Sequence, residues 1–244
     1  AGAGTNTIDK EAAARRNIPV CNVPGKNAAA VAELTMGLLI AIDRRIPENV
    51  IDLKAGRWNK KKYSVAQGLY GRHLGIIGLG AIGLAVAERA RAFGIHVYVV
   101  EKPARSAQTR EMLMRLGIEA LSDLDRLLGT CDIISLHVPS APETKGLVNA
   151  AFLEKLQPGA IIINAARGDV IEEEALLGAM NDKGIRAGLD VYADEPASGE
   201  GEFSSALARH PNTCGTHHIG ASTDQAQTAV SEGVLEVINA FADG

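Results

Sequence analysis

The stretch LGIIGLGAIG, from Leu74 to Gly83, constrains the fold of this chain more than any other segment. A short apolar run leads into glycines at positions 78, 80 and 83, and small and apolar residues at helical spacing follow as far as Phe93. Gly78 permits a tight turn, Gly80 lets a ligand approach the backbone N–H groups, and Gly83 lets a helix pack close to the strand. The stretch therefore predicts a strand, a phosphate-binding turn and a helix.

Short β-rich runs alternate with helical patterns along most of the chain, which is typical of a parallel sheet with helices on both faces. The fold class is therefore expected to be α/β, with a doubly wound parallel sheet of Rossmann type. A final helix should begin at a capping box formed by Ser222 and Gln225 and should run to about Phe241. The other expected helices span 27–45, 47–58, 82–93 and 173–180, and the expected strands span 74–78, 96–100, 133–137, 160–164, 187–191 and 213–215.

Composition excludes several classes of protein. With 244 residues, 46% of them hydrophobic, the chain can bury one large core or two modest ones. A net charge of -4 argues against a nucleic-acid partner, and the longest apolar run, at 36–42, is too short to cross a membrane. We expect a cytoplasmic protein without a metal site, in which Cys21, Cys131 and Cys214 are buried, reduced thiols.

The end of the second expected strand bears on the choice of cofactor. Glu101 follows the run IHVYVV, and a carboxylate at this position accepts hydrogen bonds from the ribose hydroxyls of NAD and repels the 2′-phosphate of NADP. Lys102 and Arg105 leave the alternative open, because they could pair with that phosphate. We expect NAD as the cofactor.

Three polar residues follow late strands, at the edge where open α/β sheets bind ligands. They are Arg167 in INAARGDV, Glu195 in LDVYADEP and His218 in THHIGAS. Each alone has an ordinary structural explanation. Together they suit the reduction of a 2-keto acid, because a guanidinium can bind the substrate carboxylate, a histidine can protonate the carbonyl oxygen, and an acid can support the histidine.

Several longer segments carry a resemblance to a known family. The chain resembles the D-isomer-specific 2-hydroxyacid dehydrogenases, and within them the phosphoglycerate dehydrogenases, over nearly its whole length. The resemblance implies that Arg167 orients the substrate, that Glu195 pairs with His218, and that His218 is the acid/base. His217 stands where the family usually has proline. The matching segments are VAELTMGLLIAIDRR, LGIIGLGAIG, DIISLHVPSAPETKGLVN, LQPGAIIINAARGDVIEEEAL, AGLDVYADEP and HHIGAST.

The resemblance also implies a set of ligand-binding residues. Asn27 matches a substrate-side asparagine, Asp190 matches the acid near the nicotinamide carboxamide, and His137 is expected to position its loop. The residues expected to bind the cofactor are Gly78, Gly80, Ala81, Ile82, Gly83, Glu101, His137, Val138, Pro139, Thr144, Ala165, Ala166, Arg167, Asp190, His218 and Gly220.

The resemblance further implies a domain division. We expect residues 26–219 to form the NAD-binding domain, residues 1–25 to be a remnant of a flavodoxin-like substrate domain, and residues 220–244 to form a helix that returns towards it. The chain enters at the last part of the N-terminal segment of the resembled family, so we expect it to bind NAD and to turn substrate over poorly by itself.

The expected reaction is oxidation of 3-phosphoglycerate to 3-phosphohydroxypyruvate, as in serine biosynthesis, and the basic run Lys60–Lys62 offers charge for an anionic substrate. Two alternatives remain open: a hydroxypyruvate or glyoxylate reductase, and an NAD-sensing, corepressor-like binding protein. We expect a homodimer or homotetramer formed through the dinucleotide domain, with the apolar helix at 27–45 packed against its symmetry mate.

Overall fold

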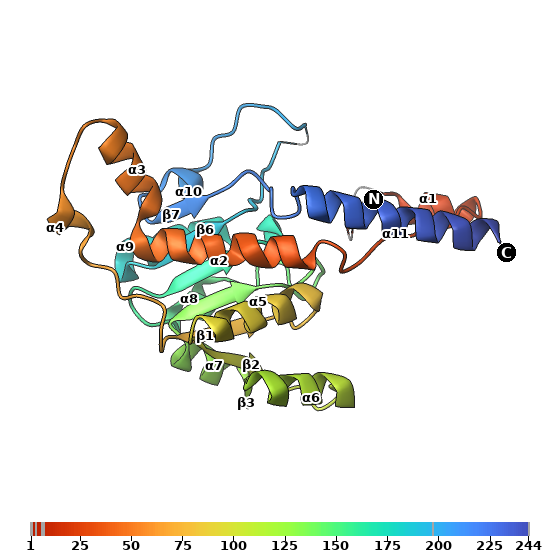
Figure 1. Ribbon diagram of the computed structural model, residues 1–244, viewed down its shortest axis with the longest axis horizontal. Coiled ribbons are helices and arrows are strands. Elements are labelled where there is room, and N and C mark those ends of the chain that lie inside the picture. The colour runs from red at the N-terminus through yellow and green to blue at the C-terminus, as the bar shows by residue number, and fades with distance from the viewer. Residues whose placement is uncertain (1, 3, 6–7, 197, 244) are drawn as a thin grey trace.

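The strands form one parallel sheet in the computed structural model, which describes residues 2, 4–5, 8–196 and 198–243 (Figure 1). The strand order is β3-β2-β1-β4-β5-β6-β7, with every neighbouring pair parallel. The Rossmann-type α/β fold expected from the sequence is thus confirmed. The strands are β1 (His73–Ile77), β2 (His96–Val100), β3 (Glu119–Leu121), β4 (Ile133–Leu136), β5 (Ile161–Asn164), β6 (Arg186–Leu189) and β7 (Thr213–Gly215).

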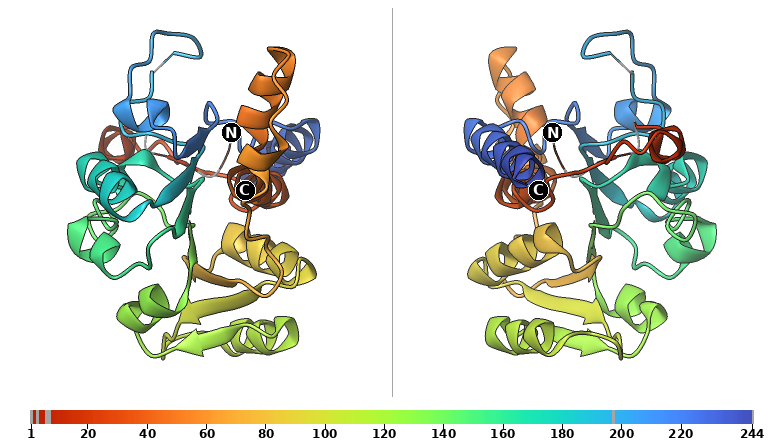
Figure 2. Two further views of the ribbon diagram at one scale, coloured as in Figure 1. Left: turned by 90° about the vertical axis from the view of Figure 1, so that its left-hand side faces the viewer. Right: turned by 90° about the vertical axis from the view of Figure 1, so that its right-hand side faces the viewer.

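Helices cover both faces of this sheet (Figure 2). α2, α5 and α6 pack on one face, and α7, α8, α9 and α10 pack on the other. The helices are α1 (Lys10–Arg15), α2 (Ala28–Arg44), α3 (Ile46–Lys54), α4 (Lys60–Tyr63), α5 (Ala81–Ala92), α6 (Ala107–Leu116), α7 (Leu124–Thr130), α8 (Ala150–Glu154), α9 (Glu173–Lys183), α10 (Ala206–Arg209) and α11 (Asp224–Ala242), and a 3₁₀ turn spans Gly168–Val170.

β4 and β5 are buried on both faces, which explains why their sequences are apolar except at Ser135 and Asn164. In β5, Ile161 and Ile163 pack against the side of α2 and α5, whereas Ile162 packs against the side of α7 to α10. Alternate side chains of one strand therefore contribute to two hydrophobic cores, one on each face of the sheet.

The register of the strands brings one end of the sheet together. Ile77 pairs with Leu136, Leu136 with Asn164, and Asn164 with Leu189. The residues that follow these four positions lie in one row at the carboxyl edge of the sheet: they are Gly78, His137, Ala165 and Asp190. The strand order also reverses between β1 and β4, so this row is at the switch point where open sheets bind ligands.

All six expected strands are present, with ends that differ by up to two residues. The seventh strand, β3, was missed, because it is three residues long, lies at the sheet edge and exposes two of its residues. The last helix begins at Asp224 rather than after Ser222, because the hydroxyl of Thr223 accepts the capping hydrogen bond from the N–H of Ala226 at 3.1 Å. The helix expected at 47–58 ends at Lys54 and is followed by the short α4.

One expectation about burial was wrong. The apolar residues of α2, including Leu38, Leu39 and Ile42, are buried within the chain itself, and the packing of this helix against a symmetry mate stays a prediction. Cys21 is exposed, while Cys131 is buried and Cys214 is half-buried, and all three thiols are free. In the described part of the chain, no helix combines the length and the apolar character needed to cross a membrane.

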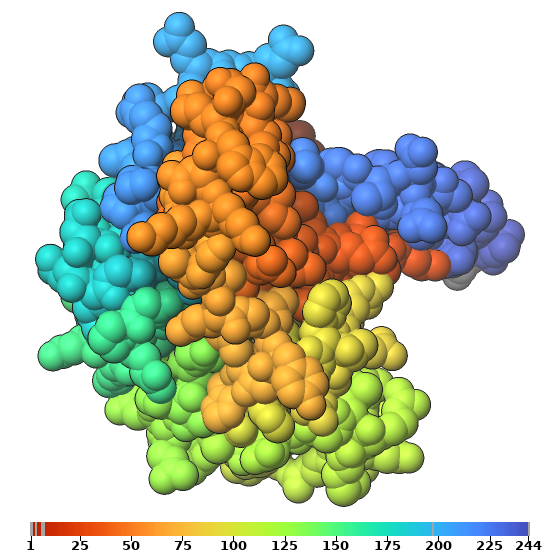
Figure 3. Space-filling view, turned by 60° about the vertical axis from the view of Figure 1, so that its left-hand side comes forward, coloured from red at the N-terminus to blue at the C-terminus, as the bar shows by residue number. Residues whose placement is uncertain are grey.

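An arm made of α3 and α4 stands out from the body of the molecule (Figure 3). α3 carries the exposed side chains Val50, Ile51 and Leu53, and Trp58 in the following loop is 81% exposed. α11 extends from the other end of the molecule (Figure 1), and α1 lies on the opposite side of the molecule from it (Figure 2).

Candidate active site

The glycine turn leaves the start of α5 open to a ligand. Gly78 has φ +101°, and a Cβ atom there would lie 2.2 Å from the carbonyl oxygen of His137. A Cβ atom on Gly83 would lie 2.1 Å from the carbonyl oxygen of Gly78, so both positions exclude side chains. Gly80 is the N-cap of α5, it makes no side-chain capping bond, and nothing lies within 4 Å of its hypothetical Cβ atom. Unpaired N–H groups in an open turn at a helix start fit the pyrophosphate of a dinucleotide.

Glu101 follows β2 directly and has an arginine partner. Its side chain is 44% exposed, and Oε2 lies 3.8 Å from Nη1 of Arg105. Arg105 is almost buried and donates a hydrogen bond of 2.7 Å to the carbonyl oxygen of Val100. Arg105 thus lies within ion-pair distance of the carboxylate, but its Nη1 makes no hydrogen bond within the described residues.

A cleft of about 450 Å³ lies along the carboxyl edge of the sheet. Eleven residues expected from the sequence line it: Asn27, Ile82, His137, Val138, Pro139, Ala165, Ala166, Arg167, Asp190, His218 and Gly220. They come from the start of α2, the start of α5 and the loops after β4, β5, β6 and β7.

His218 and Glu195 form a close pair at this cleft. Nδ1 of His218 lies 2.6 Å from Oε2 of Glu195, although the two residues are 23 positions apart. The other carboxylate oxygen of Glu195 accepts a hydrogen bond of 2.8 Å from the backbone N–H of Tyr192, which fixes the acid. Because Nδ1 faces the acid, Nε2 of the His218 ring is left for a ligand.

The loop that carries His218 is held by Asp190. Oδ1 of this buried carboxylate accepts hydrogen bonds from the Thr216 hydroxyl at 2.6 Å and the Ile219 N–H at 2.8 Å, and Oδ2 accepts from the Gly220 N–H at 2.8 Å. The N–H of His218 donates to the carbonyl oxygen of Asp190 at 2.8 Å. These bonds hold His218 at φ +52°, a left-handed conformation that is uncommon for residues other than glycine.

Arg167 lies on a turn that Asn164 shapes. The buried amide of Asn164 donates to the carbonyl oxygen of Arg167 at 2.8 Å and accepts from the N–H of Ala166 at 3.0 Å. The guanidinium of Arg167 donates to the carbonyl oxygen of Ala166 at 2.6 Å and otherwise borders the cleft. Asn27 precedes α2 without making a side-chain capping bond, so its amide is available on the same cleft.

His137 also lines the cleft, but its ring is uncharged at neutral pH. Burial lowers the pKa of His137 to about 4. Nε2 lies 2.8 Å from the hydroxyl of Ser135, and within the described residues Nδ1 is buried without a hydrogen-bond partner. A ring with this pKa cannot supply a positive charge at pH 7.

Some residues lie elsewhere than the sequence suggested. Thr144 does not line the cleft; its hydroxyl accepts from the Ala141 N–H and donates to the Pro139 carbonyl oxygen, so it shapes the turn beside the cleft. The Lys60–Lys62 run lies on α4, at the opposite end of the molecule from α11 (Figure 1), and does not line the cleft. Lys62 instead pairs with Asp52 at 2.9 Å.

Sequence reasoning missed several lining residues, namely Gly4, Thr5, Lys10, Val31, Ser140 and Ala221. Val31, Ser140 and Ala221 are near expected residues in the sequence, and that proximity was an available signal. No signal in the sequence pointed to Lys10, because its side chain reaches the cleft only through the folding of α1 back towards it.

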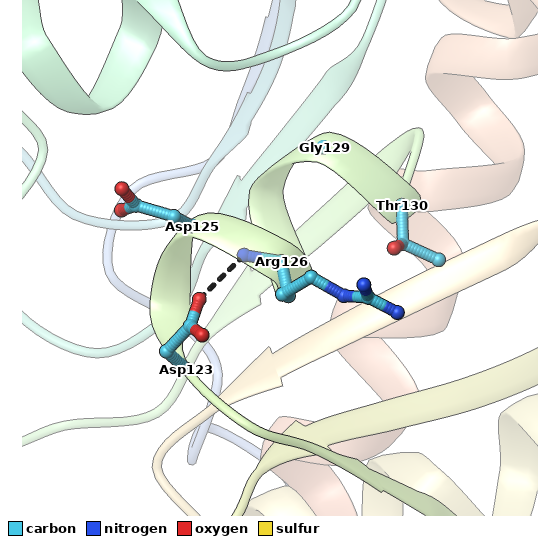
Figure 4. A pocket seen from close by; sticks show the side chains of 5 residues that line it. All are labelled: Asp123, Asp125, Arg126, Gly129 and Thr130. Carbon is cyan, nitrogen blue, oxygen red and sulfur yellow. Dashed lines mark hydrogen bonds between the residues drawn. The ribbon is translucent and has the colours of Figure 1, made fainter.

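A shallow depression beside α7 is separate from this cleft (Figure 4). It is lined by Asp123, Asp125, Arg126, Gly129 and Thr130, none of which was expected to bind a ligand. Asp123 is the N-cap of α7 and accepts a hydrogen bond of 2.8 Å from the N–H of Arg126. We interpret these residues as part of the helix start.

Comparisons with known proteins agree with this geometry. The family model for the D-isomer specific 2-hydroxyacid dehydrogenase, NAD binding domain, matches residues 36–220. The chain is 39% identical over 244 residues to a D-3-phosphoglycerate dehydrogenase of Methanocaldococcus jannaschii, in a match that covers 98% of this chain and 44% of that protein. It is 41% identical to a hydroxypyruvate reductase of Thermotoga maritima, in a match that covers 98% of this chain and 74% of that protein.

A solved structure shares the arrangement of the whole chain. A D-isomer specific 2-hydroxyacid dehydrogenase, NAD-binding, from Polaromonas sp. JS6 66 superposes with a TM-score of 0.87 at 33% sequence identity, covering 99% of this chain and 74% of that one. The chain spans less than half the length of the phosphoglycerate dehydrogenases that it matches at 38–40% identity over at least 98% of its own length.

Proposed function

This chain belongs to the D-isomer-specific 2-hydroxyacid dehydrogenases, and from that premise we propose that it serves the NAD-dependent interconversion of a D-2-hydroxy acid and the matching 2-keto acid. The observation that carries this proposal is the 2.6 Å contact between His218 and Glu195 on a cleft that Arg167 also lines. Proton transfer, support of the proton carrier and carboxylate binding require these three groups.

NAD is the cofactor of this family domain, and the residues present fit it. The turn from Gly78 to Gly83 supplies free N–H groups for the pyrophosphate, and Glu101 supplies a carboxylate for the ribose hydroxyls. The residues from His137 to Pro139, Ala165, Ala166 and Asp190 border the remaining part of the cleft. When bound, NAD exchanges a hydride with the carbon that carries the hydroxyl group.

The chain's own residues handle the proton and orient the substrate. In the reducing direction, His218 gives a proton to the carbonyl oxygen, and in the oxidising direction it takes the hydroxyl proton. Glu195 orients the ring through Nδ1 so that Nε2 faces the substrate. Arg167 binds the substrate carboxylate as a two-pronged donor, and Asn27 contacts the substrate from the start of α2.

For the substrate we propose 3-phosphoglycerate, with 3-phosphohydroxypyruvate as the product. The sequence identity of 39% to a D-3-phosphoglycerate dehydrogenase supports this choice. Lys10 adds a positive charge to the cleft, which suits an anionic substrate. Hydroxypyruvate reduction is the second candidate, because a hydroxypyruvate reductase is 41% identical and the match covers 74% of its length.

The test is a panel of 2-keto acids, with and without a phosphate group, in which oxidation of NADH is followed by absorbance. We expect turnover to fall by about two to four orders of magnitude in His218→Gln while NADH affinity stays within about twofold. His217→Pro, which restores the residue usual in the family, is the matched control and should leave turnover largely intact. Turnover that survives in His218→Gln and is lost in the control would contradict the assignment of the proton donor.

We also propose that residues 26–219 form the NAD-binding domain and that the chain self-associates through it. The apolar residues on the outside of α3, together with Trp58, support the arm as the contact surface, since apolar side chains grouped on a surface often mark interfaces. Light scattering at micromolar concentration tests this proposal. A mass of one chain across the whole range of concentration would refute it.

A further inference from the structure

A second cavity, of about 230 Å³, lies at the amino end of β6 and β7. Arg186 is the first residue of β6, whereas Asp190 follows the last residue of this strand and borders the NAD cleft. The two sites are therefore at opposite ends of the same strand. The cavity is lined by Ala41, Ile42, Arg45, Glu48, Val65, Arg186, Pro211, Asn212, Thr213 and Cys214.

The guanidinium of Arg186 has no acceptor in the part of the chain that the structure describes. It is half-buried, and it makes no side-chain hydrogen bond and no ion pair there. The nearby carboxylates of Asp43 and Asp132 are both bound to Arg72, at 3.3 and 2.6 Å. Burial, and then the charge of Arg72, lower the pKa of Arg186. Because it meets no acceptor among the described residues, this guanidinium is available to an anion in the cavity.

Two further features of the cavity suit a negatively charged guest. The hydroxyl oxygen of Thr213 is buried and has no hydrogen-bond partner among the described residues. Arg45 also lines the cavity, and its guanidinium lies over the ring of Tyr63, 5.9 Å from the centroid. Glu48 is the carboxylate among the lining residues, and its Oε1 lies 3.6 Å from Nε of Arg45. Its charge is thereby matched, which leaves the charge of Arg186 unmatched within the cavity.

We propose that this cavity binds a small tetrahedral oxyanion of the phosphate class, with Arg186 as its principal ligand and Thr213 as a neutral donor. A guanidinium presents paired N–H groups that match two oxygens of a phosphate, and it remains protonated at neutral pH. The volume is that of several water molecules at about 30 Å³ each, so a small oxyanion and a few waters fit.

Thermal unfolding of the NADH-saturated protein tests this proposal, with inorganic phosphate as the probe. Saturation with NADH fills the pyrophosphate site in the glycine turn, so phosphate cannot act there. Arg186→Met removes the charge and keeps most of the side-chain volume. Arg209→Met is the matched control, since Arg209 is in α10 and its guanidinium hydrogen-bonds the Ser204 hydroxyl at an exposed position.

The two variants should respond differently to phosphate. We expect phosphate to raise the unfolding temperature of the parent protein and of Arg209→Met, and to leave that of Arg186→Met unchanged. In phosphate-free buffer, Arg186→Met should be at least as stable as the parent, because it lacks the unpaired cation. If Arg186→Met were less stable than the parent in both buffers and still gained stability from phosphate, Arg186 would have a structural role only and the proposal would fail.

Amide chemical shifts provide a measurement that does not depend on stability. Phosphate should move the amide signals of Arg186, Thr213 and Cys214. Thr213→Val should raise the dissociation constant for phosphate by about tenfold, as expected for a lost hydrogen bond to a charged group. No shift at millimolar phosphate, or shifts confined to the glycine turn, would overturn the proposal. Amide signals that change on dilution of the protein but not on addition of phosphate would overturn the proposal, and would indicate that a second copy of the chain contacts the cavity.

Discussion

The buried ring of His137 should make the stability of this protein fall at mildly acid pH. The native ring has a pKa of about 4, whereas the ordinary value is 6.5, and burial is the cause. Between these two values the unfolded chain binds a proton that the native ring does not bind. The free energy of unfolding therefore decreases as pH falls through 6.5, and the loss is complete below about pH 4.

The size of the effect follows from the two pKa values. A difference of about 2.5 pKa units at about 1.36 kcal/mol each gives about 3 kcal/mol in total, of which about 2 kcal/mol is lost between pH 8 and pH 5. Because small domains have only about 5–15 kcal/mol of stability, such a loss is readily measured.

The test compares urea unfolding of the parent chain with that of His137→Gln at pH 8, 6 and 5. Glutamine does not titrate, and its amide can still reach the Ser135 hydroxyl, so the variant should lose about 2 kcal/mol less than the parent between pH 8 and pH 5. His96→Gln is the matched control, because it removes an exposed histidine and should follow the parent. If His137→Gln lost stability in parallel with the parent, the ring would not be buried in the uncharged form.

Four other changes test the fold and the cofactor site. Gly83→Ala should abolish NADH binding in calorimetry, because its Cβ would lie 2.1 Å from a backbone oxygen of the glycine turn; unchanged affinity would refute the close packing. Asp43→Asn should cost about 2 kcal/mol or more in urea unfolding, since it weakens a buried pair with Arg72, and a loss below about 0.5 kcal/mol would contradict this. Lys183→Met should lower the free energy of unfolding in urea by about 1–3 kcal/mol, because the ammonium binds three carbonyl oxygens at the end of α8. An unchanged midpoint of urea unfolding would contradict this role of Lys183. Glu101→Ser should narrow the preference for NADH over NADPH in calorimetry. An unchanged ratio of the two dissociation constants would show that Glu101 does not select between the two cofactors.

Much of the fold could be predicted because it depends on local rules. The turn at Gly78 requires φ above zero and Gly83 touches a backbone oxygen, so glycine at both positions is a steric requirement that can be recognised in the sequence. Strands buried on both faces are mostly apolar, and β4 and β5 follow this rule except at Ser135 and Asn164. β3 was missed because an exposed edge strand needs no such pattern.

The candidate site could be predicted only in part. Arg167, Glu195 and His218 were identified from their segments, but their separation in the chain says nothing of distance, and only the parallel pairing of β6 with β7 brings Glu195 within 2.6 Å of His218. The left-handed backbone of His218 likewise depends on hydrogen bonds that its loop donates to Asp190, 28 residues earlier in the chain.

The sequence by itself determined the six strands other than β3, where the glycine turn lies and which polar residues end at the carboxyl edge, because sterics and side-chain periodicity act over a few residues. Only the tertiary structure decided that the apolar face of α2 is buried within its own chain, that Thr144 shapes a turn instead of lining the cleft, that Lys10 reaches the cleft and that the Arg186 guanidinium meets no acceptor among the described residues. These outcomes depend on which distant segments pack together, and packing is set by the sum of many weak contacts across the whole chain.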